Sequence, residues 1–341
     1  MFDYVIVTHL PAFYKTNLYN ELSKKLRIFV IFVASQSSQR TKDFVNLNCL
    51  FDYMILNEGN FEDRNPFQSI LKLRKVIKKL KFKKLLVNGW DLSEFWWLIF
   101  TNKKEKNGLV LESTIFESKA NGLKGFIKSF FLSRISTVFA SGKLHVDLLK
   151  KMNFSGEMKI TRGVGIINKV ERQFSRVEKK YQKRFLFLGR LAPEKNLKML
   201  VSVFNDLPTH CLSIVGSGPL KLELKAFAND NIRFLDHIEN QQLQEVFNNH
   251  DFLILPSLQE PWGLVVEEAL YFGVPVMVSK NCGASELIKN GVNGFIFDPD
   301  GAKDVKGVIS NITPTLFKKM VTNFECSALF EKDQLQVSVY E

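Results

Sequence analysis

The residues best suited to chemistry lie between Phe185 and Pro299, where charged side chains follow apolar runs. Arg190 and Lys195 are two cations that come directly after the apolar run ending in Leu188. Arginine binds phosphate oxygens bidentately, lysine acts as a point charge, and free N–H groups at a helix N-terminus add to such a site. The pattern therefore indicates a diphosphate site, with a solvated loop carrying two ordinary surface cations as the alternative.

Two carboxylates in the same region are spaced for binding hydroxyl groups. Glu260 precedes an expected helix that Gly263 and Leu264 open, and Glu268 lies more than one turn into it. Carboxylates accept hydrogen bonds from paired hydroxyls, so one could hold a sugar and the other a ribose. The alternative is that both are acids favoured by the helix dipole. Glu267 points about 100° away from Glu268 and is expected to be a solvated or structural carboxylate.

A glycine-rich turn lies between these two motifs. Gly216 and Gly218 follow an apolar run and precede Pro219. Glycines at such a turn permit the backbone to approach a nucleotide closely, but an ordinary strand-to-helix turn explains them equally well.

The residue pattern does not favour a metal or disulfide site. The only D-x-D, Asp298-Pro299-Asp300, has the composition of a turn. The cysteines are too far apart for a disulfide framework or a zinc site, and they are Cys49, Cys211, Cys282 and Cys326. We therefore expect no metal, no cofactor and a reducing compartment.

The elements that position these residues alternate between apolar strands and helices, which is typical of a doubly wound α/β fold with parallel sheets. The expected strands are Tyr4–Thr8, Ile28–Val33, Leu85–Asn88, Leu109–Glu112, Thr137–Ala140, Arg184–Leu188, Leu212–Val215, Ile232–Leu235, Phe252–Leu255, Val274–Val278 and Phe295–Phe297.

The length of 341 residues predicts about two domains. We assign residues 1–167 and 185–341 to two Rossmann-like domains and the charged segment 168–184 to a linker. The strand carboxyl ends would then face a cleft between the domains, the usual ligand position in open α/β sheets. The last stretch, 313–341, predicts one or two helices, the final one able to pack back on the first domain.

The charge is concentrated in the first half of the chain. Residues 1–170 contain 28 basic and 14 acidic residues, a net charge of +14, whereas residues 171–341 carry a net charge of −2. We expect the first half to meet an anion, either a membrane surface, a phosphorylated substrate or a nucleic acid. No motif that reads nucleic acid is present, no apolar run is long enough to span a membrane, and residues 1–10 do not fit a signal peptide.

Two basic stretches predict contact with an anionic membrane. Residues 67–87 contain eight cations and no acid, with apolar residues partly at helical spacing. Residues 123–135 place Phe126, Ile127, Phe130 and Phe131 beside cations. Basic amphipathic helices bind such surfaces, although a helix that buries its apolar face in a domain has the same pattern.

The order of these motifs resembles glycosyltransferase family four, retaining enzymes of the GT-B fold. The resemblance is dense over about 115 residues and loose in the first half, and its most diagnostic part is the spacing of Glu260 and Glu268. The matching residues are Gly189, Arg190, Glu194, Lys195, Gly216, Gly218, Pro219, Ser257, Glu260, Gly263, Glu268, Gly273, Pro275, Gly283, Glu286 and Gly294.

The resemblance implies a nucleotide-sugar donor, which we expect to be UDP-linked, bound by the second domain. Arg190 and Lys195 would neutralise the departing diphosphate, and Glu260 would face the donor sugar. Glu268 would hold the ribose. The remaining donor-binding residues would be Gly189, Gly216, Gly218, Ile238, Trp262, Gly263 and Leu264.

The resemblance also implies a lipid-linked acceptor, because relatives with a basic first domain act at the inner face of a membrane. The chain is similar to bacterial O-antigen transferases, which implies transfer of a hexose or N-acetylhexosamine, with UDP-GalNAc favoured, to a polyprenyl-diphosphate-linked saccharide. We expect a cytoplasmic protein that is peripheral on the inner membrane face. The acceptor candidates are His9, Tyr14, Trp90, Asp91 and His145, and Glu112 is the candidate catalytic group of the first domain.

Two other functions remain open at this point. One is a non-enzymatic protein that binds a lipid surface or nucleic acid through its basic half, which would not need Glu260 and Glu268. The other is a sugar-nucleotide hydrolase or epimerase on the same fold.

Overall fold

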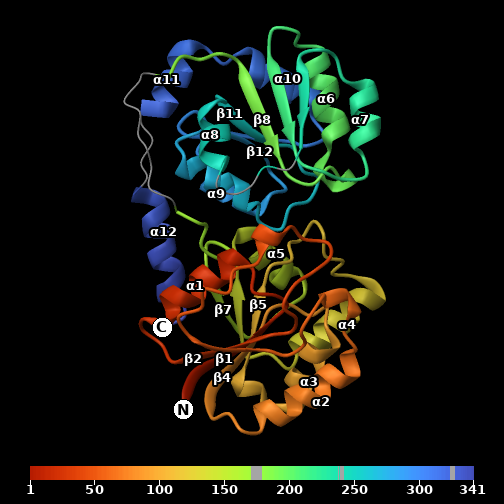
Figure 1. Cartoon of the computed structure of the whole chain (residues 1–341), viewed down its shortest axis with the longest axis vertical. Helices are drawn as coiled ribbons and strands as arrows, with labels where there is room; N and C mark the ends of the chain where they lie inside the picture. The colour runs from red at the N-terminus through yellow and green to blue at the C-terminus, as the bar shows by residue number, and fades with distance from the viewer. Residues whose placement is uncertain (170–178, 237, 239–241, 323–326) are drawn as a thin grey trace. The chain divides into compact units, whose positions relative to one another are not determined.

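The computed structural model describes residues 1–169, 179–236, 238, 242–322 and 327–341. The chain forms two compact units (Figure 1), the first made of residues 1–168 and 332–341, the second of residues 169–331. The linker expected at 168–184 falls mostly on residues 170–178, which lie outside the described residues.

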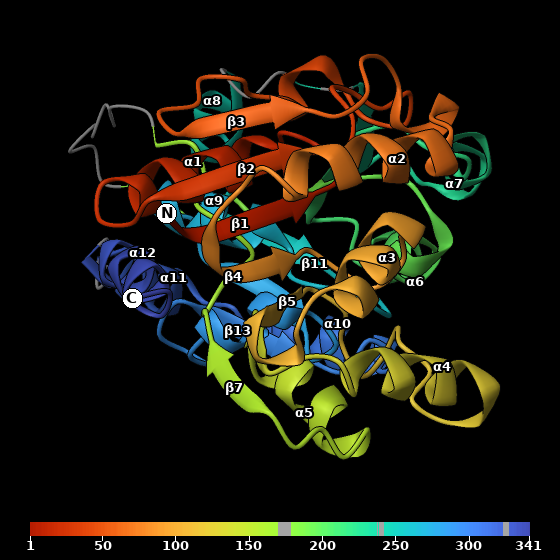
Figure 2. The same ribbon diagram turned by 90° about the horizontal axis from the view of Figure 1, so that it is seen from below.

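The first unit is built on a sheet of seven parallel strands in the order β3-β2-β1-β4-β5-β6-β7. Figure 2 shows β3, β2, β1 and β4 side by side. The strands are β1 (Phe2–Thr8), β2 (Ile28–Phe32), β3 (Asp52–Ile55), β4 (Phe82–Val87), β5 (Asn107–Leu111), β6 (Thr137–Ala140) and β7 (Glu157–Ile160).

Helices cover both faces of this sheet because successive strand residues point to opposite sides. In β1, Val5 and Val7 join one apolar core and Ile6 joins the other. The first core is closed by α2, α3, α4 and α5, and the second by α1 and α12 (Figure 1). The helices are α1 (Phe13–Ser23), α2 (Pro66–Ile77), α3 (Ser93–Thr101), α4 (Gly122–Leu132), α5 (Lys143–Lys151) and α12 (Ser327–Ser338).

The second unit repeats this plan with six parallel strands in the order β10-β9-β8-β11-β12-β13. The strands are β8 (Arg184–Leu188), β9 (Cys211–Val215), β10 (Ile232–Leu235), β11 (Phe252–Leu255), β12 (Val276–Ser279) and β13 (Gly294–Phe297). The helices are α6 (Leu197–Asn205), α7 (Lys221–Phe227), α8 (Leu243–Asn248), α9 (Leu264–Tyr271), α10 (Ala302–Ser310) and α11 (Pro314–Thr322). The predicted parallel α/β architecture is therefore confirmed in both units.

Two strands of the first sheet, β3 and β7, were not predicted. Both lie at the sheet edges and carry polar and exposed residues, among them Asp52 and Glu157. A search for apolar runs finds edge strands such as β10, whose sequence is largely apolar, but it misses β3 and β7, whose sequences mix apolar and charged residues.

The end of the chain belongs to the first unit. Tyr340 stacks on Phe139 of β6 with ring centroids 4.5 Å apart, and its carbonyl accepts a hydrogen bond of 2.8 Å from the Tyr4 hydroxyl. The prediction of one or two helices over 313–341 is confirmed by α11 and α12, and the last part of α12 packs on the first unit.

Of the two alternatives for the basic stretch 67–87, the structure fits a helix that packs its apolar face in the domain. The stretch holds α2 and then β4. Helix α2 buries Leu73 completely in the first core, while its cations Lys72, Arg74 and Lys75 are exposed. The pattern therefore belongs mainly to a helix that covers a sheet. Among the described residues, no helix is long and apolar enough to cross a membrane.

Candidate functional site

The two loops that follow β8 and β11 meet through charged side chains. The Lys195 ammonium, at the end of a short turn after β8, forms an ion pair with the Glu260 carboxylate in the loop after β11. Both side chains are mostly buried, with 16% and 13% of their surface exposed, and the Ser257 hydroxyl donates to Glu260 over 3.3 Å. The structure thus brings together two residues that the sequence placed in one site.

Arg190 lies beside this pair in the same loop. Its guanidinium donates to the Glu194 carboxylate over 2.5 Å, and the Leu258 N–H donates to the Glu194 carbonyl over 2.9 Å, which joins the loops a second time. Partial burial works to raise the pKa of the Glu194 carboxyl, but hydrogen bonds from the backbone and from Arg190 outweigh it and hold that pKa below its usual value. The Arg190 side chain remains 67% exposed, so it is accessible to a ligand.

The glycine turn after β9 packs directly against the β8 loop. Gly216 adopts a φ of +136°, and a Cβ atom there would lie 2.1 Å from the Gly189 carbonyl oxygen. A Cβ on Gly218, with φ of +156°, would lie 2.4 Å from the Leu191 carbonyl oxygen. Only glycine permits this approach. These glycines therefore bring the β9 turn against the loop that carries Arg190.

The loop after β11 leads into α9 through Gly263, whose φ of +92° is left-handed. Leu264 is the first residue of this helix, so the N–H groups of Leu264 and Val265 lie at its N-terminal end, while the Val266 N–H donates to the Gly263 carbonyl over 2.9 Å. Such groups favour an anion. The expected position of Gly263 and Leu264 at a helix N-terminus is confirmed.

Trp262 and Glu267 have structural positions. The Trp262 ring is 2% exposed and its indole N–H donates to the Glu267 carboxylate over 2.5 Å, while the Trp262 carbonyl accepts from the Cys282 thiol over 2.8 Å. The buried Trp262 ring fixes this loop and offers little exposed surface to a ligand, and donor binding by this residue stays a prediction. Glu267 is buried rather than solvated.

The other donor-side candidates lie on separate elements of the same unit. Glu268 is half-buried in α9, and Ile238 is half-buried after β10. Asp298 closes a turn by accepting from the Asp300 N–H over 3.2 Å, and its carboxylate also pairs with Lys280. Among the described residues no group of three or more metal-ligating side chains is clustered.

The first unit contains a separate pocket of about 410 Å³ at the carboxyl ends of three adjacent strands. Thr8 and His9 end or follow β1, Asn88 follows β4, and Glu112 follows β5. Parallel strands place these ends at one sheet edge. The lining residues are Thr8, His9, Leu10, Ala12, Tyr14, Lys15, Ser37, Gln39, Arg40, Phe44, Phe61, Glu62, Asn88, Asp91 and Glu112.

His9 and Asp91 form one polar pair in this pocket, with Nε2 and Oδ2 2.8 Å apart. Desolvation works to raise the pKa of the Asp91 carboxyl, but the hydrogen bond and charge of His9 outweigh it and lower that pKa. The His9 ring also packs against Phe61 and Phe95, with centroids 5.7 Å and 5.2 Å away. His9 is therefore oriented by both a carboxylate and two rings.

A second polar pair in the pocket joins Glu112, which the sequence analysis selected, to Lys15, which it did not. The Lys15 ammonium lies 2.9 Å from the Glu112 carboxylate and is nearly buried, so burial works to lower its pKa, but the charge of Glu112 raises it overall. Asn88 is 7% exposed, and its amide donates to the Tyr19 hydroxyl over 3.1 Å. Its side-chain oxygen is buried and accepts no hydrogen bond from the described residues. That oxygen is a ready acceptor for a ligand hydroxyl or amide.

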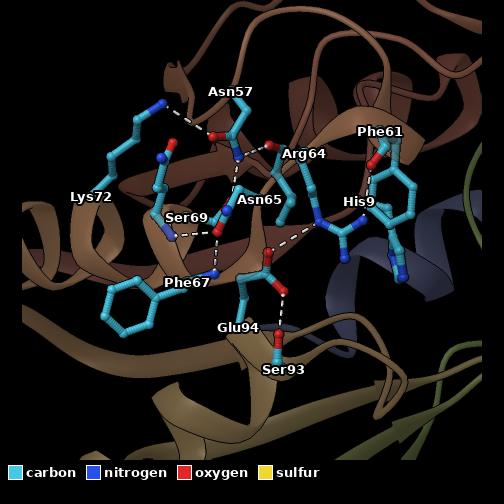
Figure 3. A network of polar contacts seen from close by, with 12 residues as sticks. His9, Asn57, Phe61, Arg64, Asn65, Phe67, Ser69, Lys72, Ser93 and Glu94 are labelled. Carbon is cyan, nitrogen blue, oxygen red and sulfur yellow. Dashed lines mark hydrogen bonds and ion pairs between the residues drawn. The ribbon is translucent and has the colours of Figure 1, made fainter.

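The wall of the pocket is held by a buried ion pair behind Phe61 (Figure 3). Arg64 lies over the Phe61 ring at 3.9 Å and donates to the Phe61 carbonyl over 2.9 Å. Its Nε lies 3.1 Å from the Glu94 carboxylate, which has no exposed surface. Asn65 begins α2 next to this pair by accepting from the Phe67 N–H over 3.0 Å.

The other acceptor candidates differ in their relation to this pocket. Tyr14 lines the pocket, and burial raises the pKa of its hydroxyl well above the usual value. Trp90 does not line the pocket, and the Lys128 ammonium lies over its ring, 5.2 Å from the ring centroid. His145 is buried with Nε2 3.2 Å from the Glu112 carbonyl, which is a structural position.

Sequence reasoning missed Lys15, Asn88, Arg64 and Glu94 as parts of this site. Asn88 gave a weak signal, because it ends an expected strand on the same edge as Glu112. Arg64 and Glu94 are 30 residues apart and gave none.

The second half of the chain is similar to a known protein family. Residues 168–313 match the family described as Glycosyl transferases group 1. A segment of 123 residues is 32% identical to the sulfoquinovosyl transferase SQD2 of Arabidopsis thaliana, covering 35% of this chain and 24% of that relative. The chain is 27% identical over 244 residues to the O-antigen biosynthesis glycosyltransferase WbnH of Escherichia coli, covering 68% of each. The first curated relatives are matched over 24% to 55% of their length.

Solved structures resemble the whole chain. The sucrose-phosphate synthase of Thermosynechococcus elongatus superposes with a TM-score of 0.73 at 16% identity, covering 99% of this chain and 96% of that one. HepE of Anabaena, in complex with UDP and glucose, superposes with a TM-score of 0.71 at 14% identity, covering 98% of both. Residues 168–313 are therefore similar to the glycosyl transferases group 1 family, within a chain whose two parallel-sheet units have the GT-B fold.

Proposed function

We propose that this protein is a retaining glycosyltransferase that takes a hexose or N-acetylhexosamine from a nucleotide sugar. The observation that carries the proposal is the pairing of Lys195 with Glu260, next to Arg190, where the loops after β8 and β11 meet. This cluster lies inside the segment that matches the transferase family. A cationic site flanked by carboxylates suits a diphosphate joined to a sugar.

The charges of this cluster suit the bond that must break. When the bond between the anomeric carbon and the diphosphate oxygen breaks, its electron pair stays on the diphosphate, and positive charge develops on the sugar. Arg190 and Lys195 would stabilise the departing diphosphate, with the N–H groups at Gly263 and Leu264 assisting. Preorganised groups of this kind supply several kcal/mol of transition-state stabilisation. Glu260 would face the sugar, either after its ion pair with Lys195 breaks or while that pair is kept.

We assign the remaining donor contacts to Glu268 for the ribose hydroxyls and Ile238 for the base. We favour UDP-GalNAc as donor and expect the two cations to suffice without a metal. The complex of the structural relative HepE with UDP and glucose supports a uridine nucleotide.

We place the acceptor in the pocket of the first unit. The pocket offers donors and acceptors of both charges, including Lys15, Asn88 and Glu112, together with the aromatic rings of Tyr14 and Phe61. Saccharides present hydroxyl groups and apolar ring faces, which match such a lining. The acceptor hydroxyl attacks the anomeric carbon and loses its proton, for which Glu112 and the His9–Asp91 pair are the candidate groups.

The acceptor is proposed to be a saccharide on a polyprenyl diphosphate, used in assembly of O-antigen or a related surface polysaccharide. The basic first half and the likeness to WbnH support this. The protein would then work as a peripheral protein on the cytoplasmic face of the membrane.

Thermal-shift measurements with UDP-, GDP- and ADP-sugars test the donor, because a ligand at about 100 times its Kd stabilises the folded state by about 2.7 kcal/mol. Incubation of the stabilising sugar with a polyprenyl-diphosphate saccharide, followed by mass spectrometry and NMR of the lipid, tests the transfer and its anomeric configuration. A glycosylated lipid with retained anomeric configuration is expected. Release of free sugar alone would show a hydrolase, an altered nucleotide sugar would show an epimerase, and either result would overturn the proposal.

A further inference from the structure

Helix α4 turns a row of large apolar side chains outward. Leu123 is 76% exposed, Phe126 71%, Ile127 44% and Phe130 53%. Their spacing of three and four residues puts all of them on one face of the helix. The opposite face is already satisfied, since Phe131 and Leu132 are buried in the first core. The exposed apolar side chains therefore do not contribute to the core of the first unit.

The apolar surface continues beyond the helix itself. Phe116, in the loop before α4, is 46% exposed. The Phe130 ring packs on Phe100 of α3 at 4.9 Å, and Phe100 stacks with Trp96. Helix α4 lies at the margin of the first unit in both views (Figure 1, Figure 2). A contiguous exposed patch of this kind marks a binding surface.

Cations surround this patch. Lys119 and Lys124 are exposed, and Lys128 and Arg134 are half-buried on or next to the helix. Between residues 113 and 134 the sequence contains a single acid, Glu117. An apolar strip edged by cations is complementary to a bilayer with acyl chains beneath anionic headgroups. Two copies of the chain meeting through this face would instead bring like charges together.

The other basic helix, α2, is built differently. Its Leu73 is buried, and only Phe67 and Leu71 are prominent apolar residues on its surface. Helix α2 thus presents many cations with little apolar surface to insert.

We propose that α4 is the membrane-docking element of this protein, inserting Leu123, Phe126, Ile127 and Phe130 into the interfacial region of an anionic bilayer. Lys119 and Lys124 contact the lipid phosphates. The inference deepens the proposed function, because a lipid-linked acceptor must be met at the membrane.

The position of α4 next to the acceptor pocket supports this assignment. The loop that starts at Glu112 runs directly into the helix. Lys128 of α4 lies over the Trp90 ring, and Trp90 precedes the pocket residue Asp91. Docking through α4 would therefore bring the membrane surface close to the pocket within the same unit.

Vesicle flotation with the full chain tests this inference. The vesicles are phosphatidylcholine alone and phosphatidylcholine with phosphatidylglycerol. The double variant Leu123→Ser with Phe126→Ser removes the two most exposed side chains, neither of which supports the core. The matched control is Phe67→Ser with Leu71→Ser on α2. We expect binding to anionic vesicles to fall at least about tenfold in the α4 variant and to change by less than about twofold in the control.

The charged part is tested by Lys119→Gln with Lys124→Gln, which is expected to weaken binding to anionic vesicles by about tenfold and to leave weak binding to neutral vesicles unchanged. The inference is overturned if the wild-type chain does not float, if the α4 variant floats like the wild type, or if the α2 control loses binding instead. Sedimentation provides a further test. If the wild type forms a dimer, the α4 variant is a monomer and neither protein binds vesicles, the exposed face of α4 contacts a second copy, and the membrane-docking inference is overturned.

A parallel UDP thermal shift separates this inference from the proposed function. An intact shift in every variant shows that the chains are folded and bind donor. If the wild type shows no shift but floats through α4, the donor assignment fails and the docking inference stands.

Discussion

Both units place a lysine–carboxylate pair at the carboxyl ends of parallel strands, yet they build it in different ways. In the second unit, Lys195 and Glu260 come from two loops with glycine, proline and left-handed turns. In the first unit, Lys15 comes from α1 and Glu112 from the end of β5, with no unusual backbone at either residue. The difference decides which site is visible in a sequence.

A site that depends on backbone shape leaves a local signature, because few residues tolerate that shape. Gly216 and Gly218 are required by contacts with neighbouring carbonyl oxygens. A site formed only by contacts between single side chains of distant elements leaves no such local signature. This is why the family match covers the second unit and not the pocket of the first.

The largest effect is expected at Lys195. We predict that Lys195→Met lowers kcat/KM for transfer by about 1,000-fold, because one preorganised group for the developing charge is lost. The matched control is Lys198→Met, whose exposed pair with Glu223 lies on the surface of the same unit. A loss below about threefold in steady-state kinetics would place the chemistry elsewhere.

The pocket of the first unit depends on its buried support. We predict that Glu94→Ala lowers the free energy of unfolding of the first unit by about 3 kcal/mol, because Arg64 is left mostly buried without its partner. In urea unfolding, Glu223→Ala, which removes an exposed partner, is expected to cost less than about 1 kcal/mol. Equal effects of the two changes would contradict the role of Glu94.

A change at the His9–Asp91 pair tests whether the first unit binds the acceptor while the second unit binds the donor. We predict that Asp91→Asn raises KM for the acceptor about tenfold, because a hydrogen bond to a charged group is worth about 1.5–3 kcal/mol. Calorimetry should find the Kd for UDP unchanged, since the change lies outside the second unit. Weaker UDP binding would show that the units do not divide the substrates in this way. Asp52→Asn on the edge strand β3 is the control.

The two units also differ in the pKa of a largely buried lysine, Lys15 in the first unit and Lys179 in the second. Glu112 keeps Lys15 charged, whereas burial lowers the pKa of Lys179 to about 8, only partly opposed by the charge of Asp251. Below about pH 8 both the folded and unfolded states bind this proton, and between about pH 8 and 10 only the unfolded state does, so the stability of the folded state rises over that range.

We predict that the wild type gains stability on the order of 1 kcal/mol relative to Lys179→Met between pH 8 and about 10. Denaturant unfolding of the two proteins across this range measures it. A constant difference would show that Lys179 keeps its proton in the folded chain.

The sequence predicted the parallel sheets, the buried strands and the loop positions of Arg190, Lys195 and Glu260, because burial and turns leave strong patterns. It did not predict the edge strands β3 and β7, whose exposed residues follow no apolar rule. It did not reveal that the Trp262 ring is buried, because the burial of a loop aromatic depends on the elements that pack around it. The Arg64–Glu94 pair required the tertiary structure.

Calorimetric titration with UDP, compared with uridine, tests the central claim most directly. The wild type is expected to bind UDP far more tightly than uridine, and Arg190→Gln with Lys195→Gln is expected to weaken UDP binding by about 100-fold or more while leaving uridine binding unchanged. Equal binding of UDP by the wild type and the double variant would contradict a diphosphate site at these two cations.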